Sequence, residues 1–222
     1  MTVKKVKAKD PGSAITHLIG TGMAVFSATP LLIKAAHQPS NVHLISLGVF
    51  IVSMILLYVA STIYHTFGQS TKVHQRLKKF DHMMIYVLIA GTYTPICMIA
   101  LGGRTGLTML TFIWSLAILG IIVTGFWVNC PKWFSSVVYI AMGWTCVLAF
   151  TQIINSLPTA AFQWLLAGGI IYTIGGIIYA LKLPIFNNRH KYFGSHEIFH
   201  LFVMGGSFCH FILMYNYIAV MP

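Results

Sequence analysis

The chain has 222 residues, of which 57% are hydrophobic and only 8% are charged, and its mean hydropathy is +0.80. Soluble domains are about a quarter charged, so this composition excludes an ordinary soluble protein and indicates an integral membrane protein. The formal net charge of +11 does not favour nucleic-acid binding, because the cations lie in short loops between apolar stretches rather than in one patch. The four cysteines form no C-x-x-C pair and are expected to pack within the membrane.

Seven apolar stretches follow one another along the chain, each close to the roughly 20 residues that a helix needs to cross the hydrocarbon core. They are too long for the strands of a membrane β-barrel. The sequence therefore predicts an all-α integral membrane protein, a bundle of seven transmembrane helices. Residues 1–12 are expected to be a basic cytosolic tail and residues 13–222 a single seven-helix domain. The expected spans are 13–35, 42–65, 79–100, 107–128, 134–154, 160–181 and 195–219.

Lysine and arginine are distributed unevenly between the loops. If the spans alternate in direction, twelve of the fourteen basic residues fall on the side that carries the N-terminus. Short basic loops face the cytosol. We therefore predict a cytosolic N-terminus and an external C-terminus.

Three of the predicted spans carry ionisable residues, which are costly in a membrane and mark candidate functional sites. The second span ends in S-T-I-Y-H, which places Ser61 four residues before His65. The third opens around Asp81, and the seventh opens with H-E-I-F-H, which contains His196 and His200. Under the predicted topology these segments meet at the cytosolic end, so three histidines and one carboxylate lie at one depth.

The histidine spacing favours a metal site. His196 and His200 share a helix face because they are four residues apart, so both can bind one ion. His65 would complete a three-histidine set with an open fourth position, the arrangement of a catalytic zinc site. The sequence therefore predicts zinc, with another divalent metal as an alternative. The simpler alternative is that these histidines cap helix ends at the headgroup level.

The segment H-E-I-F-H also matches the H-E-x-x-H motif of zinc proteases. The longer form of that motif needs glycine at 203 and histidine at 206, where this chain has Val203 and Gly206. No acidic residue follows Glu197 that could supply a third ligand. A protease is therefore not expected. Glu197 could still act as a general base, or face the headgroups or a lysine.

The other histidines are expected to be less informative. His82, next to Asp81, is a candidate for a supporting role at the site, and His210 is expected to be packed or hydrogen-bonded. The remaining ones are expected to be solvated or to face lipid: His17, His37, His43, His74 and His190.

Three motifs together resemble the hemolysin III family: S-x-x-x-H at 61–65, F-D-H-x-x-I-Y-x-L-I-A-G-T-Y-T-P at 80–95 and H-E-I-F-H at 196–200. Its members are bacterial relatives of the progestin and adipoQ receptors, which include the adiponectin receptors, and it is more distantly similar to the alkaline ceramidase superfamily. The resemblance covers essentially the whole chain. It implies a bacterial plasma-membrane protein, with zinc held by His65, His196 and His200. It also implies that Ser61 and Asp81 surround the zinc-bound water.

Residues and resemblance together predict a zinc-dependent hydrolase that cleaves a lipid amide or ester bond at the cytosolic leaflet. Asp81 would accept a proton and deliver it to the leaving group, and Ser61 would orient the water or donate to an oxyanion. A cavity beside the zinc would favour the hydrolase function. A packed site would favour a non-catalytic receptor or membrane-state sensor with a structural zinc. Hemolysin-like cytolytic activity is a third alternative, with lysis expected to be indirect because the chain is permanently membrane-embedded.

A channel or transporter is a weaker alternative. The chain has no paired repeat of the kind found in many transporters. The glycine pairs at 168–169 and 175–176 in the sixth span are expected to permit close helix packing.

Overall fold

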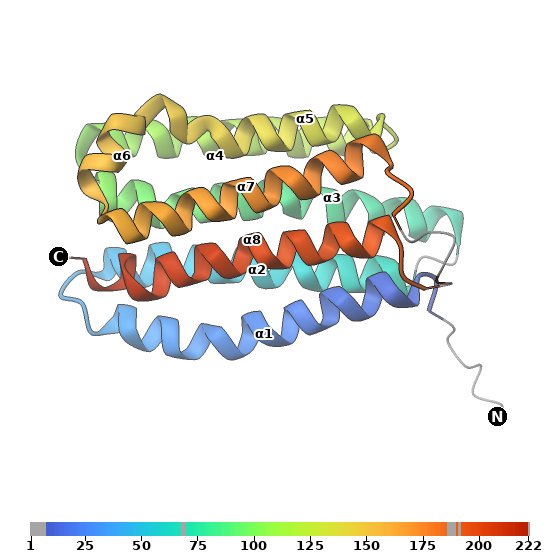
Figure 1. Cartoon of the computed structure of the whole chain (residues 1–222), viewed down its shortest axis with the longest axis horizontal. Coiled ribbons are helices and arrows are strands. Elements are labelled where there is room, and N and C mark those ends of the chain that lie inside the picture. Colours follow the sequence, from blue (N-terminus) through green and yellow to red (C-terminus); the bar gives the residue numbers. More distant parts are fainter. Residues whose placement is uncertain (1–7, 68–69, 186–189, 191, 222) are drawn as a thin grey trace.

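The computed structural model describes residues 8–67, 70–185, 190 and 192–221. Within these ranges the chain forms a bundle whose seven spans are long and apolar enough to cross a membrane (Figure 1). The first span begins at one end of the bundle and the last finishes at the other (Figure 1). The predicted all-α fold with seven spanning helices is therefore confirmed.

The helix bounds follow the apolar stretches closely. The first two spans are α1 (Pro11–Ala36) and α2 (Asn41–Phe67), and the fourth and sixth are α4 (Gly103–Phe126) and α7 (Thr159–Leu181). The third is α3 (Thr71–Pro95), which continues as the π-helical turn η1 (Ile96–Leu101). The fifth comprises α5 (Lys132–Gly143), the 3-10 segment η2 (Trp144–Ala149) and α6 (Phe150–Ser156). The seventh is α8 (Ser195–Asn216), followed by the short turn η3 (Ile218–Val220).

The third helix begins at Thr71, eight residues before the predicted start at 79. The Ser70 side chain caps it by accepting a hydrogen bond from the backbone N–H of Val73. Lysine and arginine, which follow the cap, are good helix formers. The charged stretch thus ends the apolar part of the span without ending the helix.

The fifth span is interrupted after Gly143 by a side chain from another helix. The Tyr93 hydroxyl, on α3, donates to the Gly143 carbonyl at 2.6 Å and accepts from the Cys146 N–H at 2.7 Å. A side chain inserted into the hydrogen-bond ladder breaks a helix at that point. The sequence prediction of one unbroken span at 134–154 missed this break.

One end of the bundle is rich in basic residues, and we call it the lysine-rich end. It is the end at which α1, α3, α5 and α8 begin (Figure 1). Among the described residues it carries Lys9, Lys72, Arg76, Lys78, Lys79, Lys132 and Lys182, against Lys34 and Arg104 at the opposite end. Lys4, Lys5, Lys7, Arg189 and Lys191, also predicted on this side, lie outside the described residues.

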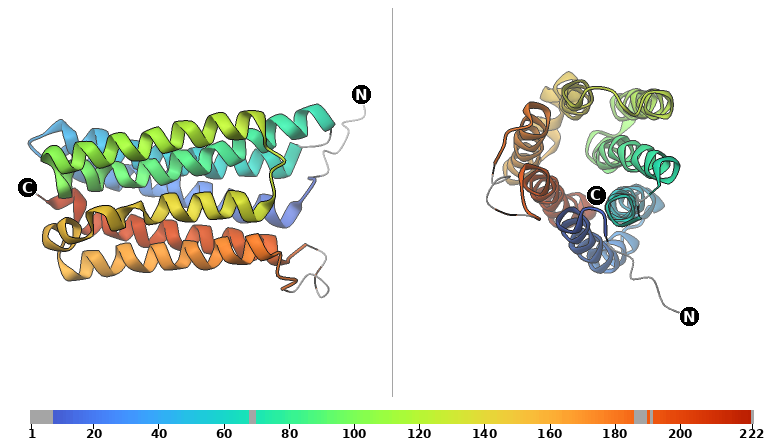
Figure 2. Two further views of the ribbon diagram at one scale, coloured as in Figure 1. Left: turned by 90° about the horizontal axis from the view of Figure 1, so that it is seen from above. Right: turned by 90° about the vertical axis from the view of Figure 1, so that its right-hand side faces the viewer.

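Most of the spans pack side by side in a ring. Seen down the bundle, α1, α2, α3, α5, α7 and α8 surround the centre, and α4 lies outside against α3 (Figure 2). Helix α8 packs between α7 and α1, so the first and last spans are neighbours. A Cβ on Gly175 of α7 would lie 2.7 Å from the Phe202 Cβ of α8, so this glycine permits the close packing that was predicted.

Candidate metal centre

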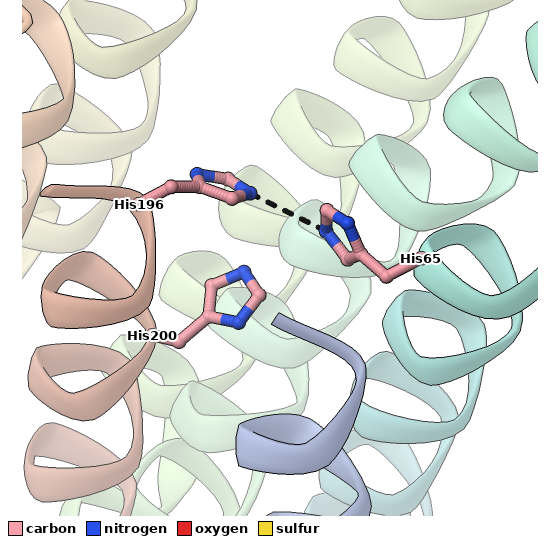
Figure 3. A group of neighbouring side chains, drawn as sticks. All are labelled: His65, His196 and His200. Atoms are coloured by element: carbon pink, nitrogen blue, oxygen red, sulfur yellow. Dashed lines mark hydrogen bonds between the residues drawn. The ribbon is translucent and has the colours of Figure 1, made fainter. Parts of the chain in front are cut away.

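Three predicted histidines come together at the lysine-rich end (Figure 3). His65 lies in the last turn of α2, and His196 and His200 lie in the first two turns of α8. One ring nitrogen from each lies within 4.8 Å of the others. His65 Nε2 and His196 Nε2 face each other at 3.3 Å (Figure 3). The three side chains form a group that could hold one metal ion.

One nitrogen–nitrogen separation within the group matches that expected around a zinc ion. Nitrogens bound tetrahedrally at about 2.0–2.1 Å from zinc stand roughly 3.3 Å apart, close to the separation between the His65 and His196 ring nitrogens. His65 and His200 are buried, and His196 is half-buried. The Nδ1 atom of His196 is itself buried without a hydrogen-bond partner among the described residues. Imidazole nitrogens bind zinc well, although they also suit other transition metals.

Asp10 supports the first of these histidines. Its backbone N–H donates to the His65 carbonyl at 3.0 Å, and its Oδ2 lies 3.1 Å from His65 Nδ1 and 2.9 Å from Lys9 Nζ. Burial alone would raise the pKa of the Asp10 carboxyl, but the hydrogen bonds and charges of Lys9 and His65 outweigh burial and hold this pKa below its ordinary value. A carboxylate at Nδ1 keeps the proton there and leaves Nε2 free to bind a metal.

Thr16 supports His200 in the same way. Its hydroxyl donates to the Ser13 carbonyl at 2.9 Å, so its proton is already in use. The Thr16 oxygen therefore offers a lone pair to His200 Nδ1, which lies 3.0 Å away. This contact favours the tautomer whose Nε2 can bind a metal. The N-cap residue of α1 and a residue of its second turn thus orient two of the three histidines.

The sequence reasoning did not identify Asp10 or Thr16 as site residues. Asp10 left a usable signal, because it is one of only three acids in the chain and the predicted topology puts it at the same end as the histidines. Thr16 left none, since threonine is common in membrane helices and its partner becomes visible only once α1 and α8 pack together.

His17 and His43 were predicted to be solvated or lipid-facing, and this prediction is wrong. His17 is only 3% exposed, and its ring stacks on His200 with centroids 3.6 Å apart. Neither of its ring nitrogens has a hydrogen-bond partner among the described residues. His43 is also buried, with Nε2 3.1 Å from the Met221 carbonyl. Helix α1 is apolar on most sides, so its sequence does not indicate which face is covered.

Glu197 has a role in holding helices together. Its Oε1 accepts a hydrogen bond from the Ser13 hydroxyl at 2.5 Å, and its Oε2 accepts from the Gly194 N–H at 2.8 Å. Both oxygens are therefore engaged in capping α8 and tying it to α1. This arrangement does not favour Glu197 as a general base.

Asp81 and Ser61 lie beside the histidines, on α3 and α2. Both side chains are buried, and both line a cavity of about 160 Å³ that His196 and His200 also line. His82 Nδ1 lies 3.6 Å from Asp81 Oδ2, which is compatible with the supporting role predicted for His82. Four of the five predicted site residues, all except His65, thus line one space.

This apolar cavity runs from the histidines into the membrane-spanning part of the bundle. Apart from the residues at its histidine end, its walls are mostly apolar, and they include Leu88, Val203 and Trp144. It reaches His210, whose Nε2 lies 3.4 Å from the Leu165 carbonyl, as expected for a packed, hydrogen-bonded histidine.

A second space, which we call the polar vestibule, lies at the lysine-rich end. Its volume is about 370 Å³, and its walls include Asp10, Lys78 and Lys132. It shares four lining residues with the apolar cavity: Asp81, His82, Tyr179 and His196. Of the three histidines, His65 lines only the vestibule, His200 only the apolar cavity, and His196 both. The candidate metal centre therefore stands at the junction of a polar and an apolar space.

Comparison with known proteins agrees with these features. Residues 6–211 match the family described as "Haemolysin-III related". The chain is 39% identical to a hemolysin-3 homolog of Bacillus subtilis (strain 168), over 95% of this chain and 94% of that protein. It is also 39% identical to hemolysin-3 of Bacillus cereus, over 93% of this chain and 90% of that protein. An adiponectin receptor protein of Drosophila melanogaster is 24% identical over 91% of this chain and 49% of the receptor.

These bacterial relatives and the seven spanning helices identify a multi-pass protein of the plasma membrane. The likeness to the fly receptor agrees with the wider relationship that the sequence motifs indicated. The chain belongs to the hemolysin III family.

Proposed function

We propose that the protein is a zinc-dependent hydrolase that cleaves an amide or ester bond of a membrane lipid at the cytosolic leaflet. The observation that carries this proposal is the apolar cavity, because His196, His200, Asp81 and Ser61 line one end of it. A purely structural metal site needs no cavity beside it. A lipid hydrolase needs one to hold an acyl chain and exclude water.

His65, His196 and His200 would hold the zinc ion. When bound, zinc acts as a Lewis acid and lowers the pKa of a coordinated water towards about 7. Asp10 and Thr16 keep the two histidines that they contact in the tautomer required for this.

Asp81 is the carboxylate that lines both spaces, so it is placed to move a proton during hydrolysis. It would take a proton from the attacking water and pass it to the nitrogen or oxygen of the leaving group. Ser61, one helical turn before His65, would donate a hydrogen bond to the oxygen of the cleaved carbonyl as negative charge develops. The apolar walls would hold the acyl chain beside these groups.

A second candidate function is that of a non-catalytic receptor or membrane-state sensor. It is favoured by the relative named an adiponectin receptor protein. In this case the zinc would tie α2 to α8, and the cavity would bind a lipid without cleaving it. Cytolytic activity, suggested by the relatives named hemolysin-3, would be an indirect effect of altered lipids, since this chain already spans the membrane.

The metal content and lipid hydrolysis of the purified full chain test the proposal on the same samples. We expect about one zinc ion per chain, lost in His196→Ala and retained in Asp81→Asn, with hydrolysis abolished in both variants. His37→Ala is the matched control, because His37 is exposed and the Ile33 carbonyl, one turn earlier, is the one hydrogen-bond partner of its side chain among the described residues. Bound zinc without hydrolysis in any sample would favour the sensor function. Wild-type protein without metal would overturn the metal site itself.

A further inference from the structure

His17 is a buried polar side chain that the proposed chemistry does not use. It lies in the second turn of α1 and is 3% exposed. Neither of its ring nitrogens has a hydrogen-bond partner among the described residues. Each other buried histidine in the described part of the chain has at least one such partner: the Met221 carbonyl for His43, Asp10 for His65, Thr16 for His200 and the Leu165 carbonyl for His210. A buried polar group without a partner is unfavourable, so a ligand that supplies one would stabilise this side chain.

Neighbouring rings fix the position of His17. Its ring stacks on that of His200, with the two planes inclined at 10° and the centroids 3.6 Å apart, and the Tyr58 ring lies 5.1 Å away. His17 also lines the apolar cavity, as do Ser61, Asp81 and His200. The unpartnered imidazole therefore lies against a proposed metal ligand, at the wall of the cavity in which hydrolysis would occur.

We propose that His17 binds the lipid at the bond to be cleaved, by donating a hydrogen bond from a ring nitrogen to the carbonyl oxygen. A neutral imidazole carries one N–H, and that of His17 has no acceptor among the described residues. Ester and amide carbonyls are acceptors, and an acyl chain in the apolar cavity would bring its carbonyl to the end lined by His17, Ser61 and Asp81. The inference rests on the proposed function for the identity of that bond, whereas binding of the carbonyl requires no turnover.

Binding is measured on the purified full chain by scintillation proximity with tritiated monolauroylglycerol, an ester. The Asp81→Asn substitution is present throughout so that the ester is not consumed, and the metal content of every sample is determined. The competing ligand is the dodecyl ether of glycerol, which has the same headgroup and chain length but no carbonyl. We expect the ester to bind about tenfold more tightly than the ether, because only the ester gives the buried donor an acceptor.

Two substitutions separate hydrogen bonding from ring stacking. His17→Phe keeps an aromatic ring against His200 but removes both nitrogens, so it should remove most of the preference for the ester. His17→Gln loses the ring but keeps hydrogen-bonding groups, so it should retain most of that preference. His210→Leu is the matched control, because His210 is a buried histidine that lines the same cavity and has a partner in the Leu165 carbonyl. An equal loss of preference in His210→Leu would mean that the general polarity of the cavity selects the ester, and would overturn the proposal.

The reverse result, with the ester preference kept in His17→Phe and lost in His17→Gln, would show that His17 acts by stacking on His200 and would overturn the proposal. Loss of the metal from both variants would also overturn it, since His17 would then hold the metal site together. If only one variant loses the metal, the other decides by the outcome given for it.

Hydrolysis by the wild type separates this proposal from the proposed function. If the wild type hydrolyses lipid and the ester preference does not depend on His17, the hydrolase function holds and the role of His17 is wrong. If the preference depends on His17 and the wild type hydrolyses no lipid, carbonyl binding by His17 holds and the hydrolase function fails.

Discussion

The candidate metal centre depends on the hydrogen bonds that orient its histidines as much as on the three histidines themselves. A histidine that binds a metal through Nε2 must carry its proton on Nδ1, and a partner at Nδ1 fixes that choice. Asp10 supplies the partner for His65, and Thr16 supplies it for His200. Asp10 is the N-cap residue of α1 and Thr16 lies in its second turn, so a helix that contributes none of the three histidines decides how two of them are oriented.

Replacing Asp10 with asparagine should weaken metal binding by about 10- to 100-fold, because it removes the charged partner of His65 Nδ1. Competition with a chelator measures the affinity, and the visible absorption of the cobalt-substituted protein reports whether the metal geometry changes. Lys9→Gln is the control, since it removes the other partner of Asp10 and leaves the contact with His65. Unchanged affinity in Asp10→Asn would show that this contact does not orient the histidine.

Replacing Thr16 with valine should also weaken metal binding, by about tenfold, because His200 Nδ1 loses its acceptor. Thr21→Val is a matched control on the same helix, since the Thr21 hydroxyl donates to the His17 carbonyl one turn earlier and has no other hydrogen-bond partner in the part of the chain that the structure describes. Chelator competition on the two variants separates the loss of this contact from a general effect of the substitution. Equal affinities in the two variants would contradict the prediction.

The residues that were correctly placed from the sequence and those that were missed required different kinds of information. His65, His196 and His200 could be grouped because each sits near the end of a span, and alternating spans bring those ends together. Placing His17 correctly required knowing which face of α1 is buried. A helix with lipid on one side and protein on the other is apolar on both, so hydropathy cannot distinguish its faces.

At the scale of elements, length and hydropathy were sufficient to locate all seven spans within a few residues, except for the start of α3. The break in the fifth span could not be predicted in this way. It is caused by Tyr93, about fifty residues earlier in the chain. The local sequence around Gly143 does not indicate such a distant contact. The broken segment matters for the site, because Gly143 and Trp144 line the apolar cavity.

Tyr93→Phe tests the origin of that break. It removes the hydroxyl that satisfies the Gly143 carbonyl and the Cys146 N–H, and leaving buried polar groups without partners costs roughly 1–3 kcal/mol. A loss of this size should lower the midpoint of thermal unfolding by several degrees in a protein of this length.

Tyr215→Phe provides the comparison for the thermal measurement, because the Tyr215 hydroxyl has no hydrogen bond among the described residues. It should leave the midpoint nearly unchanged. If Tyr93→Phe unfolds at the same temperature as Tyr215→Phe, the two backbone groups must find other partners, and the break would not depend on the tyrosine.

At the scale of the whole molecule, most basic residues and the candidate metal centre lie at the same end of the bundle. Seven of the nine described lysines and arginines lie at the lysine-rich end, together with the three histidines and the vestibule. Basic loops determine orientation during membrane insertion, and the same cations can attract an anionic headgroup. Which leaflet would supply the proposed lipid substrate therefore depends on the orientation of the chain.

We predict that the lysine-rich end faces the cytosol, because the positive-inside rule acts on short loops such as those of this chain. Fusions to alkaline phosphatase, which is active only after export, and to a fluorescent protein that folds only in the cytosol would measure this. A fusion after residue 221 should be active with the phosphatase and dark with the fluorescent protein. A fusion in the loop at 127–131, at the lysine-rich end, should show the opposite pattern. The reverse result at both positions would place the candidate metal centre at the outer leaflet, and the lipid would then have to come from that side.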